Sequence, residues 1–193
     1  GSISGAGDVT LTNSQVSGSN SNGIFALGDV TLLGSQVSDN TFNGITSFGE
    51  ITMTGSQVSG NGRNGIVAKT SSFDISMVQS VINNNTLTGI TTNGALTLDY
   101  VVVAYNGDKG IEITGNDFST MDNSILWHND NDDHQQISLS NGIVNTTYSN
   151  VQGSSSFGIN GYDDGQFVWG AGCIESNPVF TDSSGTLSSN SPC

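Results

Sequence analysis

The segment DVTLTNSQVSGSNSNGIFALG at residues 8–28 is followed by DVTLLGSQVSDNTFNGITSFG at residues 29–49, and then by EITMTGSQVSGNGRNGIVAKTSS at residues 50–72. Residue 29 repeats residue 8, so the period is 21 residues. Self-similarity at a fixed period of this length is typical of proteins built from stacked repeats. The chain is therefore interpreted as an array of one structural unit.

Apolar residues recur at fixed positions of each unit. The rows are Val9, Val30, Ile51, Ile75 and Leu96; Leu11, Leu32, Met53, Met77 and Leu98; Val16, Val37, Val58, Ile82 and Val103; and Ile24, Ile45, Ile66, Ile90 and Ile111. The first two rows lie two residues apart within a unit, which is the alternation of a strand with one buried face. Short strands that repeat so strictly can stack as coils, each pairing in parallel with its equivalent about 4.8 Å away. The sequence predicts an all-β solenoid of about seven coils.

The Gly-Ile marker also predicts the domain organisation. It begins with Ile3, continues through Ile111, changes to Gln136-Ile137 and returns at Gly158-Ile159. We expect one domain, with regular coils over residues 1–129 and the last irregular coils and a C-terminal cap over residues 130–193. Because a repeat is already under way at Ile3, we expect the chain to be a monomeric fragment cut from a longer protein.

A polar row accompanies the apolar rows at one turn position. Its members are Ser19, Asn40, Asn61, Asn85, Asn106 and Asn129. Asparagine tolerates left-handed backbone conformations, and stacked amides can hydrogen-bond to the copies above and below. The row predicts an asparagine ladder.

The units VTLTNSQVSGSNSNGI at residues 9–24 and ITMTGSQVSGNGRNGI at residues 51–66 resemble the right-handed parallel β-helix proteins of pectin-lyase-like fold. NSILWHN at 123–129, YSNVQG at 148–153, NPVF at 177–180 and SPC at 191–193 resemble the C-terminal coils of large bacterial surface β-helix proteins with a choice-of-anchor region. The resemblance implies a right-handed β-helix that is secreted or displayed on a cell surface. It leaves the activity open, because this superfamily includes lyases, hydrolases and adhesins.

The charge balance of the chain indicates which classes of binding partner can be excluded. The chain has 17 acidic and 3 basic residues, a net charge of -14. Nucleic acids and anionic membranes are polyanions bound through Lys and Arg, so neither is expected as a partner. No stretch approaches the roughly 18 apolar residues of a membrane span. A polysaccharide or a surface protein remains as a partner.

The sequence motifs give little support for a catalytic function. The three cations, Arg63, Lys69 and Lys109, are scattered, whereas a polysaccharide lyase needs basic groups that converge on a uronate. Asp132-Asp133 and Asp163-Asp164 match one segment of the hydrolases that share this fold, and the other segments are absent. No catalytic residue is assigned. A non-catalytic stalk or adhesin is the preferred function, and a polysaccharide lyase or glycoside hydrolase, or a fragment of one, is the alternative.

HNDNDDHQQ at residues 128–136 is the densest polar cluster. Asp130, Asp132 and Asp133 offer oxygen ligands of the kind that calcium prefers. The alternative is a solvated acidic loop. No cofactor is required, and calcium is the preferred candidate; a transition-metal site formed by the same aspartates with His128 and His134 is the alternative.

One outward row changes character along the chain. Gln15, Gln36 and Gln57 are followed in the same row by Val81, Val102 and Ile125, and Trp127, Tyr105 and His128 lie beside its later members. An apolar outer face is either covered or used for binding. A C-terminal segment with Phe167, Trp169 and Phe180 could cover it, or Trp127, Tyr105 and His128 could form a platform for a sugar ring or a partner protein.

Cys173 and Cys193 are the two cysteines of the chain. Their closeness in an irregular tail favours a disulfide in an oxidising compartment. Two free thiols are the alternative, since spacing does not establish bridge geometry.

Overall fold

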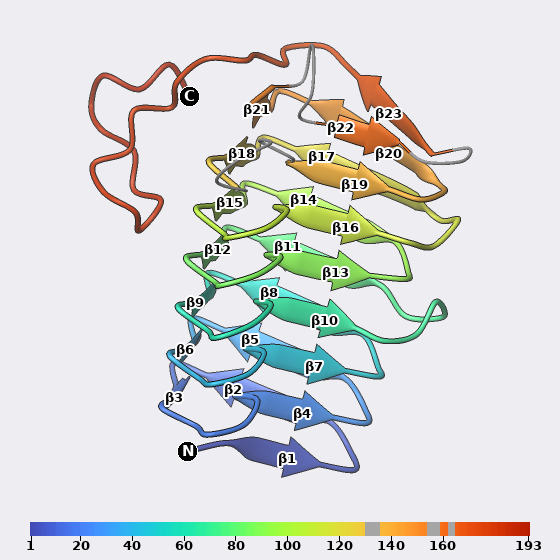
Figure 1. Ribbon diagram of the computed structural model, residues 1–193, viewed down its shortest axis with the longest axis vertical. Coiled ribbons are helices and arrows are strands. Elements are labelled where there is room, and N and C mark those ends of the chain that lie inside the picture. Colours follow the sequence, from blue (N-terminus) through green and yellow to red (C-terminus); the bar gives the residue numbers. More distant parts are fainter. Residues whose placement is uncertain (130–135, 154–158, 162–164) are drawn as a thin grey trace.

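The computed structural model describes residues 1–129, 136–153, 159–161 and 165–193, and over these residues the chain forms strands β1 to β23 and no helix. The strands stack as coils along one axis, with the N-terminus at one end (Figure 1). Seven coils each contribute one strand to each of three parallel sheets, named here A, B and C, and β22 and β23 add an eighth strand to sheets A and B. The described residues therefore contain no helix that is long and apolar enough to cross a membrane.

Sheet A consists of β1 (Ile3–Gly5), β4 (Ile24–Ala26), β7 (Ile45–Ser47), β10 (Ile66–Ala68), β13 (Ile90–Thr92), β16 (Ile111–Ile113), β19 (Ile137–Leu139) and β22 (Ile159–Gly161). Sheet B consists of β2 (Val9–Thr12), β5 (Val30–Leu33), β8 (Ile51–Thr54), β11 (Ile75–Val78), β14 (Leu96–Asp99), β17 (Phe118–Asp122), β20 (Ile143–Thr147) and β23 (Gln166–Trp169). Sheet C consists of β3 (Gln15–Ser17), β6 (Gln36–Ser38), β9 (Gln57–Ser59), β12 (Val81–Asn83), β15 (Val102–Ala104), β18 (Ile125–Trp127) and β21 (Asn150–Val151).

The register of the sheets follows the sequence rows. In sheet A, Ile66 pairs with Ile45 on one side and with Ile90 on the other. The coil in which Gln136-Ile137 replaces the Gly-Ile pair keeps the same register, because Ile137 pairs with Ile111. The predicted all-β parallel solenoid of about seven coils is confirmed, and the paired strands continue beyond residue 129 as far as β23.

The core fills the space enclosed by the three sheets. Residues from all four apolar rows, such as Ile51, Met53, Val58 and Ile66, have no exposed surface. Each fully buried aliphatic side chain contributes roughly 1.5 to 3 kcal/mol. The same contacts recur from coil to coil, so the core is a continuous column along the solenoid axis and has no single centre.

The glycine of the Gly-Ile marker has a steric role. A methyl group on Gly65 would lie 2.6 Å from the carbonyl oxygen of Gly89, the equivalent residue of the next coil. Gly23, Gly44 and Gly89 have the same close approach to the following glycine. At these four turns the approach of the next coil leaves no room for a side chain before the isoleucine, whereas Gln136 occupies this position before Ile137.

The asparagine ladder is confirmed and is buried. Asn40, Asn61, Asn85 and Asn106 each donate through Nδ2 to Oδ1 of the next member, at 2.8–2.9 Å. Asn129 donates to the side-chain oxygen of Gln136 at 2.7 Å. Gln136 thus ends the ladder over the described residues, a role that the sequence reasoning did not assign to it.

A second ladder runs through a serine row that was not singled out from the sequence. The backbone N–H groups of Ser14, Ser35 and Ser56 donate to the hydroxyl of the serine one coil further on, at 3.1–3.2 Å. The Ser124 hydroxyl accepts a hydrogen bond from the Val101 N–H and donates one to the carbonyl oxygen of Asp122. These hydroxyls satisfy backbone groups at the corner between sheets B and C.

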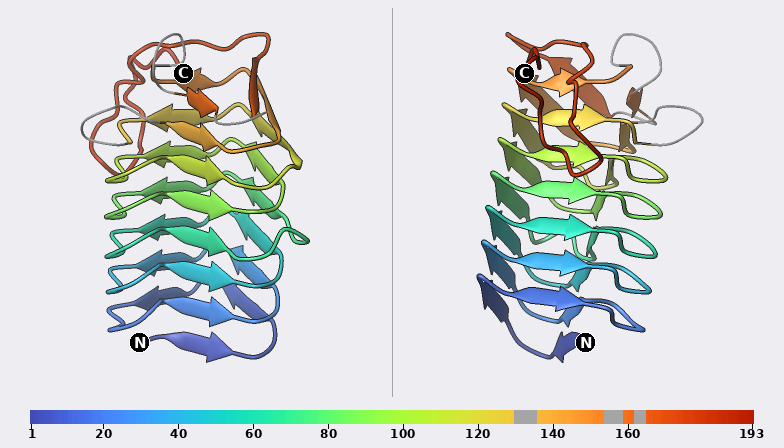
Figure 2. Two further views of the ribbon diagram at one scale, coloured as in Figure 1. Left: turned by 45° about the vertical axis from the view of Figure 1, so that its right-hand side comes forward. Right: turned by 90° about the vertical axis from the view of Figure 1, so that its left-hand side faces the viewer.

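The C-terminal segment follows β23 and leaves the stack. It passes over the upper coils and lies against the outer face of sheet C (Figure 2, right). An isolated parallel bridge from Asn150 to Ile174 and an antiparallel bridge from Phe180 to Leu187 are its described β-pairings.

Candidate functional site

The apolar outer face of sheet C lies under the C-terminal segment. Trp127 is 8% exposed and Ile125 is 6% exposed, although both belong to an outward row or stand beside it. A methyl group on Gly185 would lie 3.1 Å from Val102 Cγ1 and 3.3 Å from Val81 Cγ1. The Gly185 backbone therefore packs directly against these two side chains. In the structure the C-terminal segment thus covers the apolar face of sheet C, which is one of the two alternatives that the sequence left open.

Two kinds of contact hold the segment in place. The Phe180 ring lies 5.6 Å from the Tyr105 ring, centroid to centroid. The carbonyl oxygen of Ser183 accepts hydrogen bonds from Nδ2 of Asn83 at 2.6 Å and of Asn84 at 2.8 Å. Phe167 and Trp169, which we expected in the cover, instead belong to β23 of sheet B. That part of the expectation was wrong, because the chain completes another coil before it turns back.

The three residues of the predicted platform are brought together beside the C-terminal segment. The Tyr105 and His128 rings stack with centroids 5.3 Å apart, and the Trp127 and His128 rings meet edge to face at 6.1 Å. Tyr105 and His128 occupy the same turn position, with φ of 57° and 54°. Trp127 Nε1 is buried and has no hydrogen-bond partner among the described residues. Phe180 packs against Tyr105 while His128 stays exposed, so the C-terminal segment covers this cluster only in part.

Burial raises the pKa of the Tyr105 hydroxyl, and the nearby Asp182 carboxylate adds to this increase. A raised pKa means that the folded state favours the neutral phenol. The resulting stability is fully present below the ordinary tyrosine pKa of about 10 and is lost as the pH rises through the raised value. At neutral pH Tyr105 is therefore the neutral phenol.

The predicted disulfide is absent, and this is a correction. Cys173 and Cys193 are free thiols. Cys173 Sγ donates to the carbonyl oxygen of Thr146 in β20 at 3.5 Å, whereas Cys193 Sγ accepts from Asn150 Nδ2 in β21 at 2.9 Å. The two sulfurs are held by strands of different sheets, on either side of the corner at Tyr148.

The candidate calcium ligands Asp130, Asp132 and Asp133 lie outside the described residues. Elsewhere in the described chain, no group of three or more His, Cys, Asp and Glu side chains is close enough to hold a metal ion. The calcium site stays a prediction.

A cavity of about 520 Å³ lies beside the covered face, at the corner between sheets B and C. Tyr100 and Tyr148 line it from turns of the solenoid, and Leu187 and Pro192 line it from the C-terminal segment. Ile125, Ser124 and Asn150 contribute to its floor. Its volume falls in the range of small-molecule sites. The sequence reasoning missed this cavity, whose only signal was the pair of tyrosines at equivalent turn positions.

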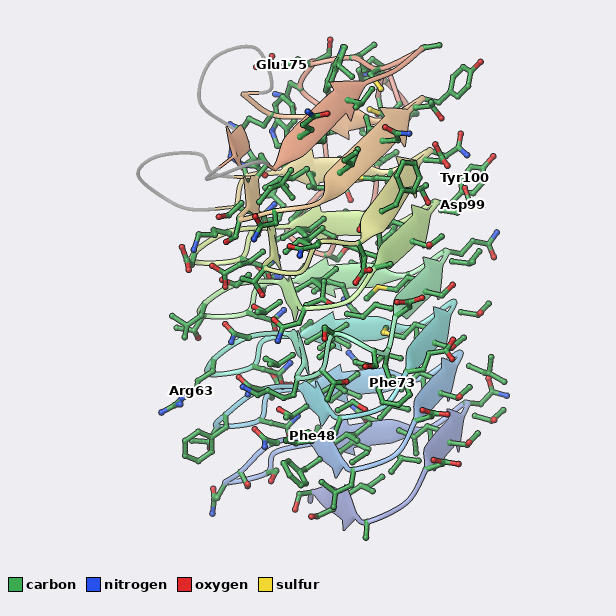
Figure 3. The ribbon with its side chains drawn as sticks, turned by 90° about the vertical axis from the view of Figure 1, so that its right-hand side faces the viewer. Phe48, Arg63, Phe73, Asp99, Tyr100 and Glu175 are labelled. Carbon is green, nitrogen blue, oxygen red and sulfur yellow. The ribbon has the colours of Figure 1, made fainter. Side chains whose placement is uncertain are left out.

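The three cations lie away from this corner. Arg63 packs over the Phe42 ring at 4.8 Å, and Lys109 Nζ pairs with Glu112 at 2.8 Å and with Asp108 at 3.9 Å. Lys69 follows β10. All three occupy turns that enter or leave strands of sheet A. Figure 3 shows Arg63 on one side of the stack and Tyr100, with Asp99, on the other.

The family model of the right handed beta helix region matches residues 2–157, so the chain belongs to this family. No curated protein matches the chain. The family assignment confirms the resemblance drawn from the repeat units and agrees with the parallel stacking of the three sheets.

Proposed function

We propose that the chain is a rigid, non-catalytic module of a secreted or surface-anchored prokaryotic protein, in which it acts as a stalk or adhesin. The observation that carries the proposal is the unbroken stacking of equivalent strands, with eight in each of sheets A and B. At about 4.8 Å for each coil, seven steps make a rod roughly 35 Å long. Buried amide and hydroxyl ladders join each coil to the next, which suits a spacer.

The placement of the charges supports a non-catalytic role. Arg63, Lys69 and Lys109 are in separate turns, and two of them already engage Phe42 and Glu112. A lyase of uronic-acid polymers needs a base and neutralising cations at one point. An acidic surface with few cations suits a saline exterior.

Exposed aromatic side chains support adhesion. Phe42, Phe48 and Phe73 are between 36% and 43% exposed. Phe42 lies in a turn from sheet C to sheet A, whereas Phe48 and Phe73 lie in turns from sheet A to sheet B. Figure 3 shows Phe48 and Phe73 on one face of the stack. Exposed apolar side chains that gather on one face mark interaction surfaces. We assign this face to contact with a polysaccharide or a surface protein.

The test applies the purified chain to neutral and acidic polysaccharides and to an array of glycans and surface proteins. We expect binding without release of reducing ends or unsaturated uronates. Replacing Phe48 and Phe73 with serine should abolish binding, while Leu33→Ser, which changes a side chain of sheet B that is 41% exposed, should not. Turnover of any polysaccharide would contradict the proposal and make the chain an enzyme.

A further inference from the structure

Two tyrosines project from the same corner of the solenoid. Tyr100 follows β14, Asn123 follows β17 and Tyr148 follows β20, and these strands are neighbours in sheet B. The three residues have φ of 54°, 50° and 47°, so they share one left-handed turn conformation. Tyr100 is 59% exposed and Tyr148 is 66% exposed, and both line the 520 Å³ cavity.

The coil spacing sets the distance between the two tyrosines. Neighbouring coils are about 4.8 Å apart, so the two tyrosine turns are roughly 10 Å apart, with the Asn123 turn between them. A group bound over Asn123 would lie about 5 Å from each tyrosine turn. A cation interacts favourably with a tyrosine face when it lies within about 6 Å of the ring centroid. Because both tyrosines line the same cavity, one compact cation inside it can contact both rings.

The upper ring is held in place by the next coil. The Tyr148 N–H donates to the carbonyl of Ala171 at 2.9 Å. Gly172 has φ of 73°, and a methyl group there would lie 2.3 Å from the Tyr148 ring, so this ring packs directly on the glycine backbone. Leu187 and Pro192 line the cavity from the C-terminal segment. This wall of the site is therefore formed before a ligand arrives.

The charges at this corner are negative. Asp99 and Asp122 immediately precede Tyr100 and Asn123. Asp99 Oδ1 accepts from Asn123 Nδ2 at 2.9 Å, and Asp122 Oδ1 accepts from the Thr147 hydroxyl. All three Lys and Arg residues of the chain lie in turns next to sheet A strands, on other corners. Charges within a Debye length of about 8–10 Å act on a bound ion, so these carboxylates favour a cation.

We propose that this cavity binds a small organic cation that carries a quaternary ammonium group. The methyl groups of such a cation suit the apolar side chains of Ile125, Leu187 and Pro192, and its charge suits the tyrosine faces. The carboxylates of Asp99 and Asp122 do not line the cavity but precede two of its lining residues, and they add a negative charge nearby. A bare metal ion fits less well, because it requires several oxygen ligands in place of an apolar lining. An anionic sugar is disfavoured by the charge. This inference does not depend on the stalk or adhesin role.

The test compares choline with 3,3-dimethylbutan-1-ol, which has the same shape without the charge, by NMR titration of the purified chain. We expect choline to bind at least about five-fold more tightly than the alcohol, with shifts at Tyr100, Asn123 and Tyr148. Tyr100→Leu and Tyr148→Leu should each weaken choline binding about three- to five-fold, whereas Tyr100→Phe, which keeps the ring face, should preserve it. Asp99→Asn should weaken the binding of choline and leave that of the alcohol unchanged.

Phe118→Leu serves as the matched control, because Phe118 is an exposed ring of sheet B that is not among the cavity lining, and it should have no effect. Equal affinity for choline and the alcohol would overturn the proposal and leave a merely apolar pocket. Binding of a neutral oligosaccharide at the tyrosines, without competition by choline, would also overturn it. Loss of choline binding in the leucine variants counts only if their amide spectra elsewhere match those of the unsubstituted chain.

Discussion

Replacing Asn85 with alanine is expected to lower the free energy of unfolding by about 3–5 kcal/mol. Asn85 is 1% exposed and lies in the middle of the ladder. Its Oδ1 accepts from the backbone N–H and the side-chain amide of Asn61, at 3.1 and 2.9 Å. Its Nδ2 donates to Asn106 Oδ1 at 2.9 Å and to the carbonyl of Val58 at 3.3 Å. The truncation leaves several buried polar groups short of partners, and each costs about 1–3 kcal/mol.

Urea unfolding followed by circular dichroism measures this loss. Asn20→Ala is the control, because Asn20 is an exposed residue next to the ladder member Ser19, and it should change the stability by less than about 0.5 kcal/mol. Each coil contacts mainly its neighbours, so hydrogen exchange should quicken most in the coils that contain Asn61, Asn85 and Asn106. A loss below about 1 kcal/mol for Asn85→Ala would show that the ladder adds little to the stability.

Gly65→Ala is expected to cost about 2–3 kcal/mol, a large penalty for one methyl group. The new carbon would lie 2.6 Å from the carbonyl oxygen of Gly89, 2.8 Å from Asn85 Nδ2 and 3.0 Å from Ile82 Cγ2. The backbone oxygen cannot move without separating the two coils. Thermal and urea unfolding of the variant measure the penalty.

Gly7→Ala is the matched substitution, since no atom lies within 4 Å of its new carbon and its backbone does not have a left-handed φ. It should leave the stability unchanged or raise it slightly, because alanine restricts the unfolded chain. Equal effects of the two substitutions would contradict the steric explanation of the Gly-Ile marker.

The sequence predicted the features that depend on the repeat. In a parallel solenoid, residues one period apart become neighbours, so rows such as Val58 with Ile82 or Asn61 with Asn85 can be read without the structure. The same reasoning found the Gly-Ile row but not the reason for its glycine. That reason is a close contact between backbones, and side-chain patterns carry no signal for it.

The remaining features depend on the irregular C-terminal segment. The outward row from Gln57 to Ile125 indicated that a cover or a ligand was needed, but Phe180 and Gly185 reach this face through a path with no repeat to fix it. The disulfide prediction failed for the same reason, because sequence closeness says little about where Cys173 and Cys193 lie once the chain leaves the stack. The cavity at Tyr100 also depends on where Leu187 and Pro192 lie.

The central claim is that the chain is a rigid rod of evenly stacked coils, and spin-label distances test it most directly. Thr97, Thr120 and Asn145 occupy one row of sheet B, which also contains Thr10. With both native cysteines replaced by serine, a label at Thr10 is paired in turn with a label at each of the other three positions, four, five and six coils away. We predict narrow distributions whose centres increase by about 4.8 Å for each coil, from roughly 19 to 24 to 29 Å. Broad distributions, or distances that do not rise in equal steps, would contradict the rod.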